Sequence, residues 1–415
     1  MSAAPDQEML SILYVGARKL MLLEGHAGTA EPKVLRCERL ENPEGFEGGL
    51  VTHLEKAARS LEILCGKSAT LAGSGDRSVI VVFGNAKLRS HSFSSSEYYR
   101  GGAKTVTGAE IRSVIEQTQS VATLPLTEHV LQAVPESFLV NDMPQIRNPL
   151  GLEATRLGVT LKIFSMNYQD YKNLAKAFDA AELTVTTCFS KTWTVSEAVL
   201  HPVEKKEGAV IIDIADDATE LILWREGELA ASRVIPTGAR ALTEKIAAAW
   251  GIGYHDAVRV KEAYAALKIQ VQFGDELIPL IERNGRESHP VKRQDFQQKM
   301  AELAAEWLGA LLASCDEFVG EYKVPHPHHI FTGGGTRIDG FLEFLQSRFS
   351  RDGRMGLAHG LEAPTELMSD PSATAALGTF RCLAAYEREV GRFLAPSGFF
   401  ERSLASVRSW FSNYF

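Results

Sequence analysis

Short, continuous apolar runs alternate along this chain with longer stretches that have helical spacing. The apolar runs at 10–16, 19–25 and 78–84 predict buried strands. An amphipathic stretch from about Gly48 to Cys65 predicts a helix between the second and third runs. This order of strands and helix is typical of an α/β half-domain. Residues 84–106, which follow, are polar and rich in serine and glycine.

The same patterns continue through the rest of the chain. Apolar positions three and four residues apart predict a helix at 107–122, another at 167–183, and long helical regions at 239–271 and 293–319. Extended runs at 129–141, 156–165 and 184–190 predict further strands. Two or more hydrophobic cores are expected for a chain of 415 residues.

The segment from Val210 to Leu229, "VIIDIADDATELILWREGEL", predicts a hairpin with an unusual turn. A buried strand ends near Ile214, a second apolar run covers 221–224, and such a layout can hold a phosphate group. The turn between them, 215–218, contains two aspartates and no glycine. A phosphate cradle needs backbone N–H groups turned toward the anion, which glycine permits and paired carboxylates oppose.

A second candidate ligand loop lies at "HIFTGGGTRIDGFLEFL", residues 329–345. Three consecutive glycines, Gly333, Gly334 and Gly335, follow an apolar strand, and a helix is expected to begin near Asp339. Glycines in this position let the backbone approach a flat or anionic group near unpaired helix N–H groups. A plain tight turn is the alternative.

Bulk composition excludes several classes of protein. The net charge of −8 argues against a protein whose main partner is nucleic acid. The five cysteines are scattered, without a Cys-x-x-Cys pair, and are expected to be reduced and structural. Because the first residues have no basic and apolar leader pattern, and no apolar run reaches about 18 residues, we expect neither export nor a membrane-spanning helix.

Two hairpins followed by a triple-glycine turn is the order found in the actin-like ATPase superfamily. Within it, the chain resembles the bacterial cell-division protein family FtsA along nearly its whole length. The resemblance rests on "HVLQAVPESFLVNDMPQIRNPLGLEATRL" (129–157), "VIPTGARALTEKIAAAWG" (234–251), "TGGGTRIDGF" (332–341) and "DPSATAALGTF" (370–380). The first of these belongs to a small extra subdomain that general actins and chaperone ATPases lack.

The resemblance implies an α/β, actin-like (ribonuclease H-like) fold of two lobes, with an inserted subdomain and a C-terminal amphipathic helix. The expected parts are subdomain IA at 1–78 and 165–206, the inserted subdomain IC at 79–164, subdomain IIA at 207–238 and 316–369, subdomain IIB at 239–315, the closing helix of IA at 370–394, and a linker with the membrane-targeting helix at 395–415.

Departures from the family pattern fall on the phosphate-binding hairpins. The first hairpin has Tyr14 where the family has a metal-directing aspartate, and Ala17 and Arg18 where small hydroxyl residues are usual. The second keeps Asp213, but Asp216 and Asp217 replace glycines. Two carboxylates about 4 Å from a triphosphate each cost several kcal/mol at an effective dielectric near 20, unless basic groups such as Arg18 and Lys19 compensate.

The resemblance places a nucleotide site at Gly16, Lys19, Asp213, Thr219, Gly333, Gly334 and Gly335. Three states of this site stay open: a hairpin that serves only as packed sheet, ATP binding without turnover, and true ATPase activity. ATP and Mg²⁺ are therefore doubtful cofactors, and we assign no catalytic residue and no metal ligand.

The tail "FFERSLASVRSWFSNYF" predicts an amphipathic helix after a turn-forming linker, "APSG". Large apolar and aromatic side chains lie on one stripe, which suits a bilayer interface, with Trp at the level of the headgroups. A helix that docks on its own domain or on a partner is the alternative. The expected membrane-binding residues are Phe399, Phe400, Leu404, Val407, Trp410 and Phe411.

Two polar segments are further candidates. By resemblance, the basic loop "NGRESHPVKRQ" (284–294) lies in the subdomain that receives the acidic C-terminal peptide of the tubulin-like ring protein FtsZ, with Arg286, Lys292 and Arg293 as contacts. The histidines of "VPHPHHI", His326, His328 and His329, are a candidate metal cluster, but they lack carboxylate or cysteine neighbours in sequence and a structural role is favoured.

The sequence therefore predicts a non-enzymatic adaptor of bacterial cell division. It would hold the FtsZ ring and other divisome proteins at the inner face of the cytoplasmic membrane and would self-associate into filaments. An active actin-like ATPase and a PilM-like pilus scaffold are the alternatives.

Overall fold

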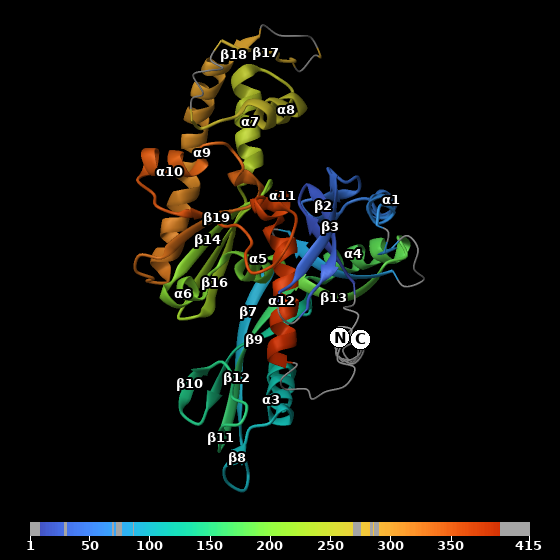
Figure 1. The fold of residues 1–415 in the computed structure, drawn as a ribbon, viewed down its shortest axis with the longest axis vertical. Coiled ribbons are helices and arrows are strands. Elements are labelled where there is room, and N and C mark those ends of the chain that lie inside the picture. Colours follow the sequence, from blue (N-terminus) through green and yellow to red (C-terminus); the bar gives the residue numbers. More distant parts are fainter. Residues whose placement is uncertain are drawn as a thin grey trace, which may run out of the picture. The chain divides into compact units, whose positions relative to one another are not determined.

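The computed structural model describes residues 9–28, 31–68, 70–71, 77–85, 87–268, 275–282, 285 and 290–390 (Figure 1). The chain divides into two compact units. Unit 1 comprises Met1–Ala198, Ala358–Leu367 and Ala375–Phe415, and unit 2 comprises Val199–Leu357 and Met368–Thr374. Across the described residues, none of the helices has the length and apolar character needed to cross a bilayer.

The larger sheet of unit 1 has five strands in the order β13-β6-β1-β2-β3. Strand β1 pairs antiparallel with β2 and parallel with β6, and the helices α1 and α4 pack on one face of the sheet through a shared apolar core. The bounds of these elements are Leu10–Gly16 (β1), Lys19–His26 (β2), Lys33–Glu41 (β3), Ser78–Gly84 (β6), Thr184–Ser190 (β13), Leu54–Cys65 (α1) and Tyr168–Ala180 (α4).

A second sheet in unit 1 has four antiparallel strands in the order β10-β9-β12-β7. Helix α3 covers one face of it, and the N-terminus of α3 is closed by a capping box between Thr107 and Glu110. The bounds are Arg89–Tyr98 (β7), Glu128–Val140 (β9), Met143–Ile146 (β10), Arg156–Asn167 (β12) and Gly108–Val121 (α3), with a small ribbon of Lys104–Thr105 (β8) and Glu153–Ala154 (β11).

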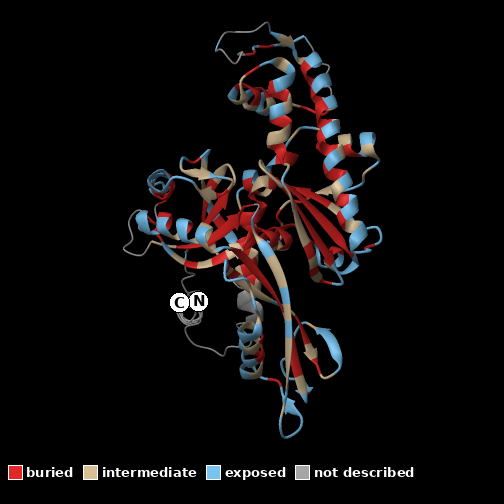
Figure 2. Cartoon of the chain, turned by 180° about the vertical axis from the view of Figure 1, so that it is seen from behind, coloured by how far each residue is buried: buried red, intermediate tan, exposed pale blue. Residues whose placement is uncertain are grey.

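Unit 2 is built on a five-stranded sheet in the order β16-β15-β14-β19-β20, and its core continues into the helices α7, α8, α9 and α10. The bounds are Ala209–Ile214 (β14), Thr219–Arg225 (β15), Glu228–Ile235 (β16), His328–Thr332 (β19), Arg354–Met355 (β20), Ala239–Trp250 (α7), Tyr254–Tyr264 (α8), Arg293–Glu321 (α9) and Phe341–Phe349 (α10). Figure 2 shows the buried residues concentrated in the sheets and on the inner faces of the helices.

Shorter elements complete the two units. They are Phe46–Glu47 (β4), Leu50–Val51 (β5), Lys191–Val199 (α5), Pro202–Glu207 (α6), Leu277–Ile278 (β17), Val291–Lys292 (β18), Thr365–Met368 (α11) and Thr374–Val390 (α12), with 3-10 turns at Gly334–Thr336 and Pro371–Ala373.

Two predicted helix boundaries are wrong. The helix expected from Gly48 begins at Leu54, because β4 and β5 form a small ribbon first. The region expected to be helical from Ala239 to Val271 contains two helices: Gly251 ends the first with φ 65, and α8 ends at Tyr264. The helix expected near Asp339 is confirmed: it begins at Phe341, after Gly340 with φ 76. In the last two cases a left-handed glycine sets the break.

Candidate functional site

The first hairpin, between β1 and β2, is filled by the side chain of Tyr14. Gly16 and Gly84 are register partners on the parallel strands β1 and β6. A Cβ added to Gly16 would lie 2.6 Å from Tyr14 Cε1, and one added to Gly84 would lie 2.6 Å from Tyr14 Oη. The tyrosine, which is 7% exposed, therefore lies directly over both glycines. An aromatic ring occupies the place where the family pattern has a metal-directing carboxylate.

Arg18, beside this hairpin, has a partner within unit 1. Arg18 Nε donates to Asn42 Oδ1 at 3.0 Å, and the Asn42 backbone N–H donates to the Arg18 carbonyl at 2.6 Å. Lys19 is half-buried at the start of β2. Both residues belong to unit 1, whereas Asp216 and Asp217 belong to unit 2.

The charge of the acidic turn is partly balanced from within unit 2, by Arg240. Arg240 Nε donates to Asp216 Oδ2 at 3.2 Å, and Arg240 Nη2 lies 2.6 Å from Asp217 Oδ1. The second contact is a close ion pair rather than an aligned hydrogen bond. Burial lowers the pKa of Arg240, but the nearby carboxylates of Asp217 and Asp216 raise it further, so that it ends above its ordinary value. One guanidinium thus bridges both carboxylates.

Helix α7 supplies that arginine and also donates its first backbone N–H groups to the turn. Ala239 N–H donates to the Ala215 carbonyl at 2.9 Å, and Arg240 N–H donates to the Asp216 carbonyl at 2.8 Å. The first N–H groups of a helix are the donors that an anion ordinarily meets. At α7 these two donors are used by the hairpin itself.

Gly238 permits this close approach of helix to turn. A Cβ at this position would lie 2.3 Å from the Asp216 carbonyl oxygen and 2.5 Å from the Ala215 carbonyl oxygen. A glycine that precedes a helix N-terminus is therefore needed here for packing within the protein.

The two other predicted residues on this hairpin are buried. Thr219 is 0% exposed and its hydroxyl donates to the Thr237 carbonyl at 2.7 Å. Asp213, 4% exposed, lies against the triple-glycine loop, because a Cβ at Gly333 would be 2.3 Å from its Oδ1. The structure therefore brings Asp213 and Gly333 together.

The triple-glycine loop packs on β14 and on the segment before α12. Gly333 has φ 88 and its N–H donates to the Pro371 carbonyl at 3.1 Å. A Cβ at Gly335 would meet Ile214 Cγ2 at 2.3 Å, whereas one at Gly334, which is exposed, would meet nothing closer than 3.7 Å. Two of the three glycines are thus required by contacts inside unit 2, and only Gly334 faces solvent.

Neither hairpin, taken by itself, fits a magnesium-bound triphosphate. The carboxylate position is an aromatic ring, the threonine hydroxyl and two helix N–H groups already have partners, and an arginine is held by both aspartates. Within the described residues no group of three or more His, Cys, Asp or Glu side chains is placed to hold a metal ion.

The basic loop is tied to acidic residues of its own unit. Lys292 Nζ lies 2.9 Å from Asp275 Oδ1 and Arg293 Nη1 lies 2.6 Å from Glu276 Oε2. The Lys292 side chain keeps 57% of its surface exposed and that of Arg293 only 16%. Arg293 also stacks over the Tyr264 ring, with 5.7 Å from Cζ to the ring centroid. Arg286 lies outside the described residues.

The histidine segment has structural contacts. His328 Nε2 lies 2.9 Å from Glu207 Oε2, and His329 Nε2 lies 3.1 Å from Arg351 Nη1. Burial, with a smaller contribution from Arg351, lowers the pKa of His329 to about 4. The predicted membrane-binding residues from Phe399 to Phe411 also lie outside the described residues.

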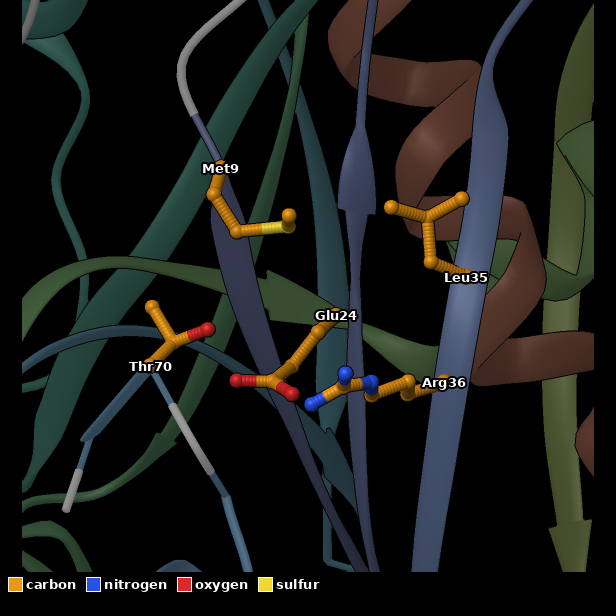
Figure 3. Close-up of a pocket in the computed structure, with 5 residues that line it drawn as sticks. All are labelled: Met9, Glu24, Leu35, Arg36 and Thr70. Carbon is orange, nitrogen blue, oxygen red and sulfur yellow. The ribbon is translucent and has the colours of Figure 1, made fainter.

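A pocket that the sequence did not suggest opens in unit 1, at the opposite end of β1 and β2 from their hairpin turn. It has a volume of about 290 Å³ and is lined by Met9, Glu24, Leu35, Arg36 and Thr70. Figure 3 shows the Glu24 carboxylate and the Arg36 guanidinium facing one another across it. Glu24 is 3% exposed and accepts a hydrogen bond from Ser68 Oγ at 2.5 Å. None of the predicted site residues lines this pocket.

Two family models match the chain. The model described as cell division protein FtsA matches residues 210–378, and the model described as the SHS2 domain inserted in FtsA matches residues 88–165. The latter range contains α3 and the four-stranded sheet except for the end of β12.

Relatives of known name agree with these models. Cell division protein FtsA of Pseudomonas aeruginosa is 22% identical over 379 residues, which is 91% of this chain and 90% of that protein. FtsA of Neisseria meningitidis serogroup B is 20% identical and covers 99% of both chains. FtsA of Escherichia coli K12 is 24% identical over 74% of this chain and 73% of that protein.

Solved structures share the fold. A chain of a PilM-PilN type IV pilus biogenesis complex aligns with a TM-score of 0.61 at 15% identity, over 92% of this chain and 99% of that one. MreB5 of Spiroplasma citri bound to AMPPNP aligns with a TM-score of 0.52 at 12% identity, over 94% and 100% of the two chains. The fold is therefore actin-like, as predicted. With the family models and the named relatives, this shows that the chain belongs to the FtsA family of bacterial cell-division proteins.

Proposed function

We propose that the protein is a cell-division adaptor that links the FtsZ ring to the inner face of the cytoplasmic membrane and binds ATP weakly or not at all. The proposed lack of tight nucleotide binding is supported by one observation: side chains of this protein occupy both hairpins. Tyr14 lies over Gly16 and Gly84, and Arg240 pairs with Asp216 and Asp217. A ligand phosphate at the second hairpin would have to displace Arg240 and the two helix N–H groups of α7 from their partners.

Titration calorimetry with ATP and magnesium tests this part of the proposal. We expect no saturable binding at micromolar concentration, and no phosphate release above background, from the unmodified protein. The double variant Asp216→Gly, Asp217→Gly changes the formal charge of the clamp from one net negative to one net positive, because Arg240 remains. We expect this variant to bind ATP more tightly than the unmodified protein.

The matched control is Asp216→Asn, Asp217→Asn, which removes the same charges but keeps a side chain on each turn residue. Its affinity for ATP is expected to lie between those of the unmodified protein and the glycine variant. Micromolar or tighter binding of ATP by the unmodified protein would contradict the proposal. Steady phosphate release would favour an active ATPase instead.

The link to FtsZ is proposed to use the exposed basic side chains at the start of α9. Lys292 keeps 57% of its side chain exposed beside a single aspartate, so its charge remains accessible to an acidic peptide. Arg293 is largely covered, and its proposed role is to hold Glu276 and Tyr264 in place. Arg286 is proposed as a second contact by resemblance.

Fluorescence anisotropy with a labelled acidic C-terminal peptide of FtsZ measures this contact. We expect Lys292→Glu and Arg286→Glu each to weaken binding several-fold, with a steep dependence on salt because the contact is charged. Lys299→Glu, on helix α9 and paired with Glu302, is the charge-matched control. Equal loss in all three variants would point to net charge alone and would contradict a defined peptide site.

The membrane contact is proposed for the tail. Burial of the apolar side of the tail at a bilayer interface contributes roughly 5 to 10 kcal/mol before ordering costs, at about 25 cal/mol per Å² of apolar area. The side chains to be buried are Phe399, Phe400, Leu404, Val407, Trp410 and Phe411. We expect Trp410→Glu or Val407→Glu to abolish co-sedimentation with liposomes, and Ser406→Glu only to weaken it. If the protein without residues 395–415 still pelleted with liposomes, the tail would not be the anchor.

A further inference from the structure

Strand β7 is an unusually exposed edge of the four-stranded sheet. Among the described residues it pairs only with β12, through ten register pairs from Arg89↔Ser165 to Tyr98↔Arg156, without a register shift. None of its ten residues is fully buried, whereas nine of the twelve residues of β12 are. Figure 2 accordingly shows pale blue and tan along this strand. A long, regular edge strand presents a row of backbone N–H and C=O groups to another strand.

The other described edge strands of the main sheets are interrupted. The pairings of β3, β10, β13 and β16 each contain a register shift, and β20 has only two residues. Strand β10 also contains Pro144, and β3 carries five charged side chains along nine residues. Bulges, proline, charges and short length are devices that prevent edge-to-edge pairing. Strand β7 has no bulge and no proline, and its only formal charges lie near its two ends.

We propose that β7 is an interface with a second copy of this chain, in which the two β7 strands pair antiparallel about a two-fold axis through Phe93. This would be a side-by-side contact, separate from any head-to-tail assembly of the protein, and it does not depend on the nucleotide or membrane proposals. Because the same patch is used by both copies, the contact closes on itself and gives a pair rather than a chain.

The charges of the strand select this register. Side chains of odd number on β7 face α3, as the contacts of Phe93 and Ser95 with the α3 side show. A continuous sheet must keep odd residues opposite odd residues, since a slip of one residue turns every side chain to the other face. Centring the pair on Phe93 places Arg89 opposite Glu97 of the second copy, twice by symmetry, and Phe93 opposite its own copy. Shifting the centre by one residue loses both matches.

The side chains on the other face of β7 are already satisfied within one copy and would not obstruct the contact. Ser92 Oγ accepts from Lys162 Nζ at 2.6 Å, and Ser94 Oγ and Thr160 Oγ1 lie 3.0 Å apart. Among the odd-numbered residues, Arg89 donates to Glu128 at 2.6 Å but keeps 65% of its side chain exposed, and a guanidinium has five donors. A single strand pair is smaller than a stable protein interface, so we expect a weak dimer that forms mainly when copies are concentrated side by side.

Disulfide trapping tests the register. In the proposed pair Ser92 lies opposite Ser94 of the second copy, with Cα atoms about 4.5 to 5.5 Å apart, which suits a disulfide. Ser92 and its own copy are diagonal neighbours about 7 to 8 Å apart, and so are the two copies of Ser94. In a Cys37→Ser background, which removes the half-buried native thiol, a mixture of Ser92→Cys and Ser94→Cys proteins should therefore form dimers at least about tenfold faster than either variant alone.

A charge variant tests the interface independently. Ser94→Lys places two lysines next to the two-fold axis and should reduce the dimer fraction of the otherwise unmodified protein, measured by sedimentation velocity, at least about fivefold. Ser113→Lys, an exposed position on α3, carries the same charge change away from the edge and should leave dimer formation unchanged. Equal trapping rates for the mixture and the single variants, or an equal effect of the two lysine variants, would overturn the proposal.

Discussion

Replacing Arg240 with alanine would test whether the acidic turn depends on its arginine. The side chains of Asp216 and Asp217 are 10% and 25% exposed, and that of Arg240 is 37% exposed. Loss of one partner of a fully buried ion pair costs about 3 to 5 kcal/mol, and an exposed pair contributes about 0 to 1 kcal/mol. The exposure of this cluster lies between these limits, and the substitution leaves two carboxylates without their shared cation. We therefore expect Arg240→Ala to destabilise unit 2 by about 1.5 to 3 kcal/mol.

Urea unfolding followed by tryptophan fluorescence measures the effect. Trp224, Trp250 and Trp307 belong to unit 2, and the first and last of them are buried, so their emission reports its unfolding. With a slope of about 2 kcal/mol per molar urea, the expected loss moves the midpoint by roughly 1 M. Arg240→Lys keeps the charge but cannot bridge both carboxylates in the same way, and should lose about half as much.

A mutant cycle separates the ion pair from the packing of the arginine stem. In the background Asp216→Asn, Asp217→Asn, the change Arg240→Ala should cost less than about 0.5 kcal/mol, because there is no uncompensated charge left to expose. If Arg240→Ala moved the midpoint equally in both backgrounds, the arginine would act through packing alone. If it moved the midpoint in neither, the clamp would not stabilise the turn, and the argument for a closed second hairpin would fail.

Three further outcomes follow from the structure. Gly335→Ala should destabilise unit 2 by about 2 kcal/mol or more by urea unfolding, since its Cβ would lie 2.3 Å from Ile214 Cγ2, whereas Gly334→Ala should be nearly neutral. Burial lowers the pKa of His129 to about 4 from an ordinary 6.5, so the stability of unit 1 should fall as pH drops from about 6.5 toward 4, and His129→Phe should flatten this dependence. Thr219→Val, which removes the hydrogen bond to the Thr237 carbonyl, should cost about 1 to 2 kcal/mol in the same unfolding assay and should not change ATP binding.

The sequence predicted the buried strands of both hairpins because continuous apolar runs such as 10–16 and 209–214 report their burial directly. It gave only a polar, serine-rich composition for 84–106, where the structure has β7. That strand contains no fully buried residue, so it lacks the alternation of apolar and polar positions by which an edge strand is usually found. It is a strand because it pairs with β12, and that pairing cannot be seen in its own residues.

The candidate site could be predicted only in part. Asp216 and Asp217 were found because they replace glycines in a recognisable turn, but Arg240 lies more than 20 residues further along and reaches them only through the packing of α7 on that turn. A basic residue two positions after a glycine at a helix start was the available signal. Tyr14 was identified as a departure from the family pattern, yet its contact with Gly84 depends on the pairing of β1 with β6.

The contacts of Gly333 and Gly335 change what can be inferred from a glycine-rich loop. These glycines are held in place by Asp213 and Ile214, so mutation would be resisted by the fold whether or not a nucleotide ever entered the loop. The presence of this glycine-rich pattern therefore does not by itself indicate a bound nucleotide. The informative positions are residue 14, the pair at 216 and 217, and residue 240, because in this protein their side chains occupy the two hairpins.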